Sequence, residues 1–155
     1  MSLLLLYVSV WLVLFGWASF IDFKSFILPD WLTLPLMLSG VVFNALSLDN
    51  FCSATDSLLG VLLGYGLIRL VDECYFKLKK QRGIGQGDAK LMAAIGAILG
   101  WQAIFPLLCC AAILGVVVGL ALMRLKRLTL KNPIPFGPFL SLFACAFIFE
   151  KVLPR

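Results

Sequence analysis

The sequence predicts an all-α, polytopic membrane protein with about six transmembrane helices, folded as a single domain over residues 1–155. Its composition is 62% hydrophobic and 14% charged, with a mean hydropathy of +1.04, whereas soluble domains are about half apolar and a quarter charged. Long apolar stretches alternate with short polar segments, and Lys and Arg gather in alternate segments. A chain of this length cannot bury so much apolar surface in its own interior, but a bilayer accommodates it.

The first three predicted spans cover residues 3–21, 31–48 and 58–76. The first span has no basic segment before it and no small-x-small cleavage site, so we expect a retained helix and not a cleaved signal. Pro35 falls in the first turn of the second span, where the missing N–H costs little. The segment before the third span, residues 49–57, carries no Lys or Arg.

The next apolar run, residues 91–123, is too long for one crossing. As one helix it would measure about 50 Å, whereas the hydrocarbon core is about 30 Å thick. We therefore predict a break near residues 100–106, which leaves a short fourth span at 89–103 and a fifth at 105–123. After a polar loop, residues 139–153 form the sixth span.

Three of the predicted spans carry a GxxxG pair. The pairs are Gly60/Gly64, Gly96/Gly100 and Gly115/Gly119. Paired glycines let two helix backbones approach closely in lipid. The pattern predicts tight packing among the third, fourth and fifth spans.

The Lys and Arg residues predict the orientation in the membrane, because positive charge favours the cytoplasmic side. Ten of them fall in or beside the segments after the first, third and fifth spans: Lys24, Lys77, Lys79, Lys80, Arg82, Lys90, Arg124, Lys126, Arg127 and Lys131. The opposite side has only Lys151 and Arg155, and Arg69 lies inside the third span. We therefore expect both termini on the extracytoplasmic side.

The net charge of +5 would suggest nucleic acid in a soluble protein, but here the charge lies mostly in two clusters between apolar runs, so we predict no nucleic-acid partner. The five cysteines form no CxxC pair and histidine is absent. Zinc sites are usually built from Cys and His. We therefore predict no metal and no other cofactor.

The stretch GIGQGDAKL, residues 83–91, places an acid between glycines and an apolar run. It is not a phosphate-binding loop, because Asp88 stands where a Walker A loop needs glycine, and its GxGxG spacing is not that of a dinucleotide fingerprint. Asp88 could cap the helix that follows. A cap does not explain the alternating glycines, which let the backbone approach another chain or a substrate.

Two acids are predicted to lie at the same membrane edge. Asp22 follows the first span, and Asp88 opens an unusually short span that draws its carboxylate toward hydrocarbon, where ionisable groups are costly and usually functional. Two facing carboxyls share one proton, so one acts as a base on water while the other donates to a carbonyl oxygen. Asp30, just before the second span, is interpreted as a helix cap.

Three stretches resemble the type IV prepilin peptidases, which are aspartic membrane proteases of the GxGD class. They are IDFKSFILPDWLTLPLMLSGVVFN (residues 21–44), GIGQGDAKLMAAIGAILGW (residues 83–101) and PIPFGPFL (residues 133–140). Asp22 and Pro29 match the D-x6-P segment of the family, and Gly85, Gly87 and Asp88 match its GxGD motif. The resemblance covers essentially the whole chain.

The resemblance implies an endopeptidase of the bacterial inner membrane that removes the short basic leader of prepilins or pseudopilins at the cytosolic face. Such substrates serve a type IV pilus or a type II secretion system. Asp22 and Asp88 would be the catalytic pair, and Gly85, Gly87, Pro29, Asp30 and Lys90 would support the site. Many bacterial members also carry paired CxxC motifs and methylate the pilin; without CxxC in this sequence, the resemblance does not extend to methylation.

Two other function classes fit a membrane chain with acids in its spans. A small transporter would bind protons or cations, and it predicts acids near the bilayer centre. A non-catalytic protein of a secretion assembly would not need both motif aspartates. The oligomeric state stays open.

Overall fold

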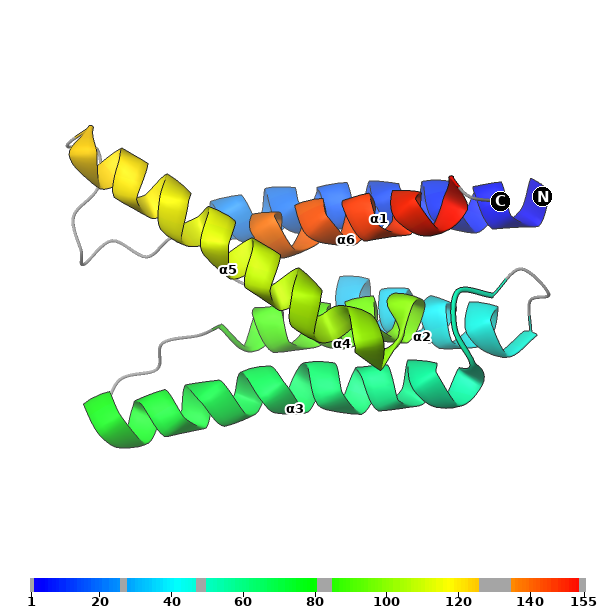
Figure 1. The fold of residues 1–155 in the computed structure, drawn as a ribbon, viewed down its shortest axis with the longest axis horizontal. Helices are drawn as coiled ribbons and strands as arrows, with labels where there is room; N and C mark the ends of the chain where they lie inside the picture. Colours follow the sequence, from blue (N-terminus) through cyan, green and yellow to red (C-terminus); the bar gives the residue numbers. More distant parts are fainter. Residues whose placement is uncertain (1, 26–27, 47–49, 81–84, 126–134, 154–155) are drawn as a thin grey trace.

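The computed structural model describes residues 2–25, 28–46, 50–80, 85–125 and 135–153, and within these ranges it is helical without a strand. The helices are α1 (Ser2–Ser25), α2 (Asp30–Leu46), α3 (Ala54–Lys79), α4 (Gln86–Leu99), α5 (Trp101–Arg124) and α6 (Gly137–Val152) (Figure 1). The predicted all-α class with six helices is confirmed.

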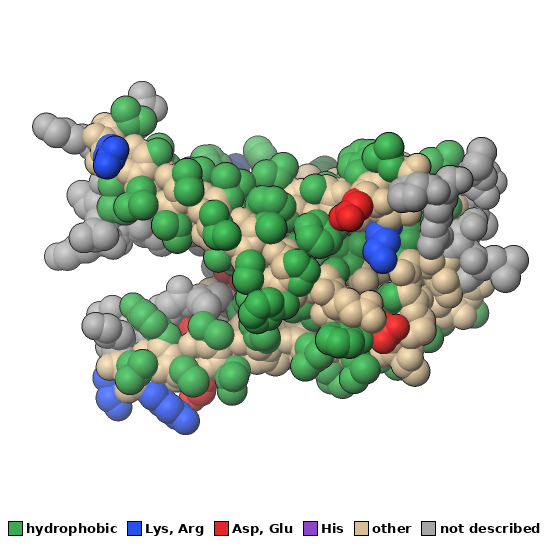
Figure 2. Space-filling view, viewed as in Figure 1, with side chains coloured by type: hydrophobic (Ala, Val, Ile, Leu, Met, Phe, Trp, Pro, Cys, Tyr) green, Lys and Arg blue, Asp and Glu red, His purple; other side chains and the backbone are tan. Residues whose placement is uncertain are grey.

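Three of these helices are long and apolar enough to cross a membrane, namely α1, α3 and α5. Helix α2 is apolar but has only 17 residues, and α4 and α6 have 14 and 16. At 14 residues, α4 is about 21 Å long, which is less than the ~30 Å hydrocarbon core. Apolar side chains cover most of the visible face in Figure 2, as expected for a surface that contacts lipid.

The structure places two helix boundaries, those beside Asp22 and Asp88, at other residues than the sequence predicts. Helix α1 continues to Ser25, so Asp22 lies inside its last two turns and not behind the helix. Helix α4 begins at Gln86, so Asp88 lies in its first turn, and the N-cap residue is Gly85. Both acids are therefore carried by helices, which fix their direction more firmly than loops would.

The predicted break in the long apolar run occurs at a single residue. Gly100 ends α4 with a φ of +83°, and its amide donates to the carbonyl of Gly96 at 2.9 Å. Few residues other than glycine adopt such a positive φ. Helix α5 then starts at Trp101, before the predicted 105, and includes Pro106.

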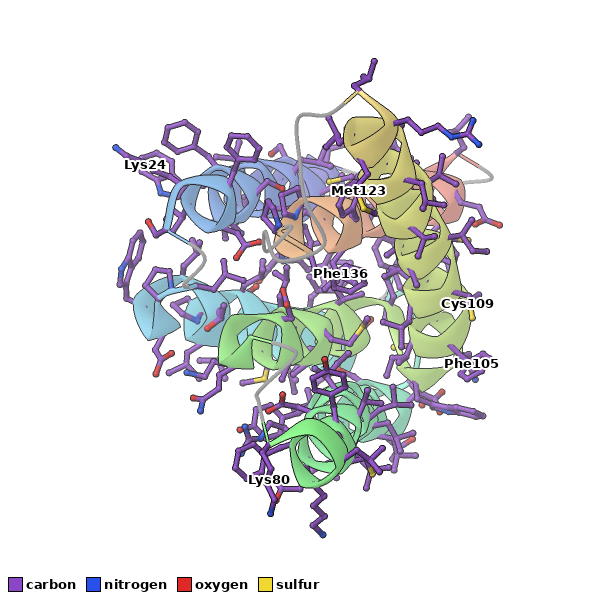
Figure 3. All side chains as sticks on the ribbon, turned by 90° about the vertical axis from the view of Figure 1, so that its left-hand side faces the viewer. Lys24, Lys80, Phe105, Cys109, Met123 and Phe136 are labelled. Carbon is purple, nitrogen blue, oxygen red and sulfur yellow. The ribbon has the colours of Figure 1, made fainter. Side chains whose placement is uncertain are left out.

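Both termini lie at one end of the molecule, and α1, α3 and α5 finish at the opposite end (Figure 1). Figure 3 looks onto that opposite end and shows Lys24 and Lys80 on different sides of it. Arg124, the last residue of α5, belongs to the same end. The basic residues that the structure describes thus gather as the sequence predicts, while Arg82, Lys126, Arg127 and Lys131 lie outside the described residues.

Helices α3 and α4 pack backbone against backbone. A Cβ on Gly60 would lie 2.2 Å from the Gly96 carbonyl oxygen, and one on Gly64 would lie 2.6 Å from that of Met92. This confirms the packing predicted for the first two glycine pairs at Gly60, Gly64 and Gly96. The prediction was wrong for Gly115, because the atoms nearest to a Cβ there belong to the rings of Phe139 and Phe136, at 3.7 Å or more, and not to another helix backbone.

Polar side chains complete the buried end of α4. The amide nitrogen of Asn44 donates to the carbonyls of Ala97 and Ile98, each at 2.9 Å, and the Ser57 hydroxyl donates to Ala97 at 2.6 Å. The Asn44 oxygen accepts the amide of Phe51 at 3.0 Å. Carbonyls at a helix end need such partners where water is excluded, so these bonds allow α4 to stop inside the apolar region.

The Gly60–Gly96 contact can be tested with two alanine substitutions in α3. Gly60→Ala should lower the free energy of unfolding by about 1–3 kcal/mol, because overpacking forces the helices apart. Gly66→Ala is the matched control, since nothing lies within 4 Å of a Cβ there; higher helix propensity should leave it equal to or above wild type. Thermal unfolding in detergent micelles measures both, and an unchanged Gly60→Ala variant would contradict the close contact.

Candidate active site

Asp88 sits at the start of α4, where its side chain is buried, with the residue only 8% exposed. The backbone N–H of Asp88 donates to the carbonyl of Gly85, the N-cap, at 3.2 Å. A Cβ on Gly87 would lie 2.9 Å from the Cβ of Leu28 and 3.1 Å from its nitrogen. Gly87 therefore lets α4 approach the segment that leads into α2, which sets the place of Asp88.

This contact corrects part of the sequence interpretation of the glycines. The chain that comes close to Gly87 is the protein's own segment at Leu28, so no space remains there for a substrate. Gly85 differs, because a Cβ there would be 3.5 Å from Asp88 Oδ2, an ordinary contact. Gly83, the first glycine of the stretch, lies outside the described residues.

Asp22 comes from α1 and is held by the start of α6. It is 6% exposed, and its Oδ2 accepts the amide of Gly137 at 2.9 Å. Gly137 follows the N-cap residue Phe136, and a helix N-terminus attracts negative charge. A Cβ on Gly137 would lie 2.6 Å from the same carboxylate oxygen, so only glycine leaves room for Asp22.

Asp22 near the end of α1 and Asp88 in the first turn of α4 are carried toward the same end of the molecule. Helix α6 packs on both of the helices that carry them, α1 and α4. The two acids that the sequence placed at one membrane edge thus lie toward one end of the molecule, where α1 finishes and α4 begins (Figure 1), and their role as a pair stays a prediction. Both groups are buried from bulk solvent, where one shared proton costs less than two charges.

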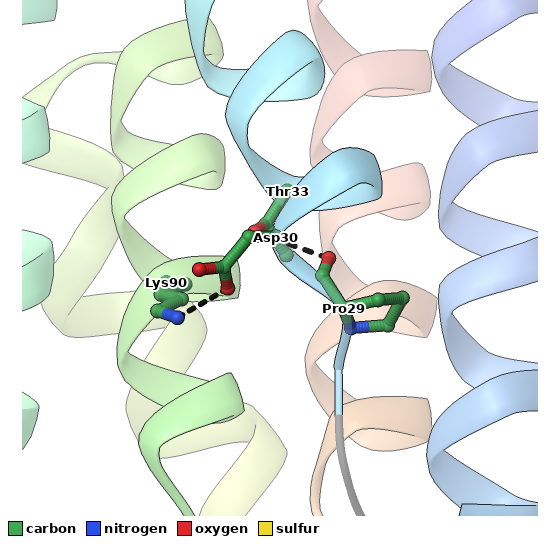
Figure 4. A network of polar contacts seen from close by, with 4 residues as sticks. All are labelled: Pro29, Asp30, Thr33 and Lys90. Atoms are coloured by element: carbon green, nitrogen blue, oxygen red, sulfur yellow. Dashed lines mark hydrogen bonds and ion pairs between the residues drawn. The ribbon is translucent and has the colours of Figure 1, made fainter.

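An ion pair joins the start of α2 to the first turns of α4. Lys90 lies two residues after Asp88 in α4, and Figure 4 shows its ammonium group donating to Asp30 Oδ1. The predicted cap role of Asp30 was wrong, because its carboxylate binds Lys90, while the Pro29 carbonyl accepts the first amides of α2, including that of Thr33 at 3.3 Å. The pair thus ties the start of α2 to α4 near Asp88, and the support role predicted for Pro29, Asp30 and Lys90 stays a prediction.

The described ranges hold no group of three or more His, Cys, Asp and Glu side chains that could bind a metal ion. The groups that the chain itself brings to this place are two carboxyls and backbone amides. Such a pair can hold a proton, orient a water and exchange protons with a carbonyl oxygen and an amine.

The stretch PIPFGPFL carries part of the family resemblance but had no predicted role, so the hydrogen bond from the Gly137 amide to Asp22 was not predicted. The available signal was local: Gly137 and Pro138 follow polar loop residues and precede an apolar run, which is typical of a helix start. The sequence did not indicate which side chain would accept the amide. Pro133 and Ile134 lie outside the described residues.

Comparison with known proteins places the chain among leader peptidases. A model of the type IV leader peptidase family matches residues 6–120, a range that contains both aspartates. The leader peptidase HopD of Escherichia coli is 42% identical over 141 residues, which cover 89% of this chain and 86% of that protein.

Longer relatives match over a part of their length. The prepilin leader peptidase/N-methyltransferase of Aeromonas hydrophila is 40% identical over 124 residues, 80% of this chain and 42% of the relative. That of Burkholderia pseudomallei is 38% identical over 131 residues, 84% of this chain and 42% of the relative. The chain thus spans less than half the length of these relatives. No solved structure matches it.

The Lys90–Asp30 pair should contribute little to stability, because 30% and 61% of its side-chain surfaces are exposed. A double-mutant cycle with Lys90→Met, Asp30→Asn and the combined variant should give a coupling energy of about 1 kcal/mol or less. Unfolding at low and high salt measures it, and the coupling should shrink with salt. A coupling that is several-fold larger and insensitive to salt would show that the pair is shielded from water.

Proposed function

Because the chain belongs to the type IV leader peptidase family, we propose that it is a membrane-embedded aspartic endopeptidase that removes the short basic leader of type IV prepilins or pseudopilins. The observation that carries this proposal is the pair of buried acids, Asp22 and Asp88, which come from separate helices and lie toward the same end of the molecule.

The proposed mechanism uses these two side chains and one water. One carboxylate takes a proton from the water as the oxygen attacks the carbonyl carbon of the scissile amide. The other carboxyl donates its proton to the carbonyl oxygen, which gives a neutral tetrahedral diol. Collapse of the diol re-forms the carbonyl, breaks the C–N bond and transfers a proton to the leaving amine. The Gly137 amide holds Asp22 in place through these steps.

We further propose that this end of the molecule faces the cytosol in a bacterial inner membrane. The support is the gathering of Lys24, Lys80 and Arg124 at the end that carries the two carboxyls. Positive charge favours the cytoplasmic side. A leader at the cytosolic face would then meet the pair at the membrane edge. The substrates would serve a type IV pilus or a type II secretion system.

Asparagine substitutions test the catalytic pair. Asp22→Asn and Asp88→Asn should each reduce prepilin processing by about 10²-fold or more, because neither amide can serve as base or acid. Co-expression with a prepilin, followed by the size shift on a gel, measures leader loss, and immunoblotting confirms equal enzyme levels. Normal processing by either variant would refute the dyad, and a transporter or an assembly protein would leave the leader intact even with the wild type.

Gly137→Ala tests how Asp22 is positioned. The added methyl would lie 2.6 Å from the carboxylate oxygen, and displacement of a catalytic group by about 1 Å can cost about 10²-fold in rate. We expect kcat to fall while prepilin binding to the membrane-embedded enzyme is kept. Gly16→Ala in α1 is the matched control, since nothing lies within 4 Å of a Cβ there. Equal activity of the two variants would contradict the role of Gly137.

A further inference from the structure

An apolar groove of about 400 Å³ lies between α5 and the start of α6. Gly115 and Gly119 line it on the α5 side, and Phe136 and Phe139 line it on the α6 side. Leu120 stands at its edge with 55% of its surface exposed. None of the lining residues is charged.

The groove is linked to Asp22 through the start of α6. Phe136 lines it, and the next residue, Gly137, donates its amide to Asp22. Figure 3 shows Phe136 near the middle of this end of the molecule, while Phe105 and Cys109 point outward from α5.

The dimensions of the groove suit a helix. Its lining on α5 runs from Ala112 to Met123, a rise of about 16 Å or three turns. It extends from the end that holds Asp22 into the middle of α5, the most apolar of the candidate spans. Glycines on its α5 side allow another helix backbone to come close, and aromatic side chains flank it.

We propose that this groove receives the apolar helix of the substrate that follows the scissile bond. The inference rests on the proposed function, because a prepilin cut beside Asp22 must lead its apolar segment from the carboxyls into the membrane. The α5–α6 groove is lined by apolar residues, and its residue Phe136 directly precedes Gly137, which binds Asp22. The substrate helix would lie along α5 with small side chains toward Gly115 and Gly119.

Two other grooves fit this occupant less well. One, of about 250 Å³ between α2, α3 and α4, includes Lys90, whose charge is paired with Asp30. Another, of about 500 Å³, includes Glu150 and Lys151 and lies toward the end of the molecule that holds the C-terminus. An apolar helix that docked in either of these two grooves would give up contact with lipid and would meet charged side chains.

Photocrosslinking locates the substrate helix. A photoreactive phenylalanine replaces Leu120 in the groove, Leu62 in the α2–α3–α4 groove or Ala121 on the outward face of α5, each in the full chain with Asp22→Asn. The probe is an epitope-tagged prepilin in the same vesicles. We expect a crosslinked product at Leu120 at least tenfold stronger than at Leu62 or Ala121. Crosslinks that favour Leu62, that are equal at all three positions, or that join only lipid or a second copy of this chain would overturn the inference.

Kinetics separate binding in the groove from a structural effect. Gly115→Leu should lower kcat/KM at least tenfold for the full prepilin but leave unchanged a soluble peptide that spans the scissile bond and ends before the apolar segment. Ala121→Leu is the matched control. Normal prepilin cleavage by Gly115→Leu, or equal loss on both substrates, would overturn the inference. If the wild type cleaves no prepilin, the proposed function itself fails and the inference falls with it.

Discussion

The backbone contact between α3 and α4 at Gly60 and Gly96 is the constraint on which the rest of the structure depends. Helix α4 is too short to cross the membrane alone, so its depth is set by what it packs against. The two glycines hold it against α3, and Asn44 completes its buried carbonyls. With its far end held there, the first turn of α4 brings Asp88 to one defined level beside Asp22.

Glycine has a second use close to the two acids. Gly87 lets α4 approach Leu28, and Gly137 lets α6 approach the Asp22 carboxylate. In both cases the missing Cβ allows packing within the protein. A carboxyl pair works only when each group is held within a fraction of an ångström, since small displacements cost rate. Tight packing at these glycines supplies that precision with few polar contacts.

A hydrolase in a membrane needs water and buried apolar surface in one place. As the proposed catalytic pair, Asp22 and Asp88 would meet this need, because both are buried yet lie near helix ends, close to polar segments. The α5–α6 groove is lined by apolar residues and includes Phe136, next to the Gly137 that binds Asp22. A substrate with a polar leader and an apolar helix would match this division, with its scissile bond at the boundary between the two environments.

The sequence by itself determined the all-α class, the six helices and a break within residues 100–106, and it singled out Asp22 and Asp88 as candidates, because length, apolar runs and residue type are local properties. It predicted the first two glycine contacts but not the groove at Gly115, and it assigned Asp30 to a cap and not to Lys90. The tertiary structure decided the groove at Gly115, the Asp30–Lys90 ion pair and the hydrogen bond from the Gly137 amide to Asp22. The physical reason is that side chains facing lipid and side chains facing the core are equally apolar. Hydrophobic periodicity therefore cannot say which face of a helix meets a neighbour, and only the packed helices bring such distant residues together.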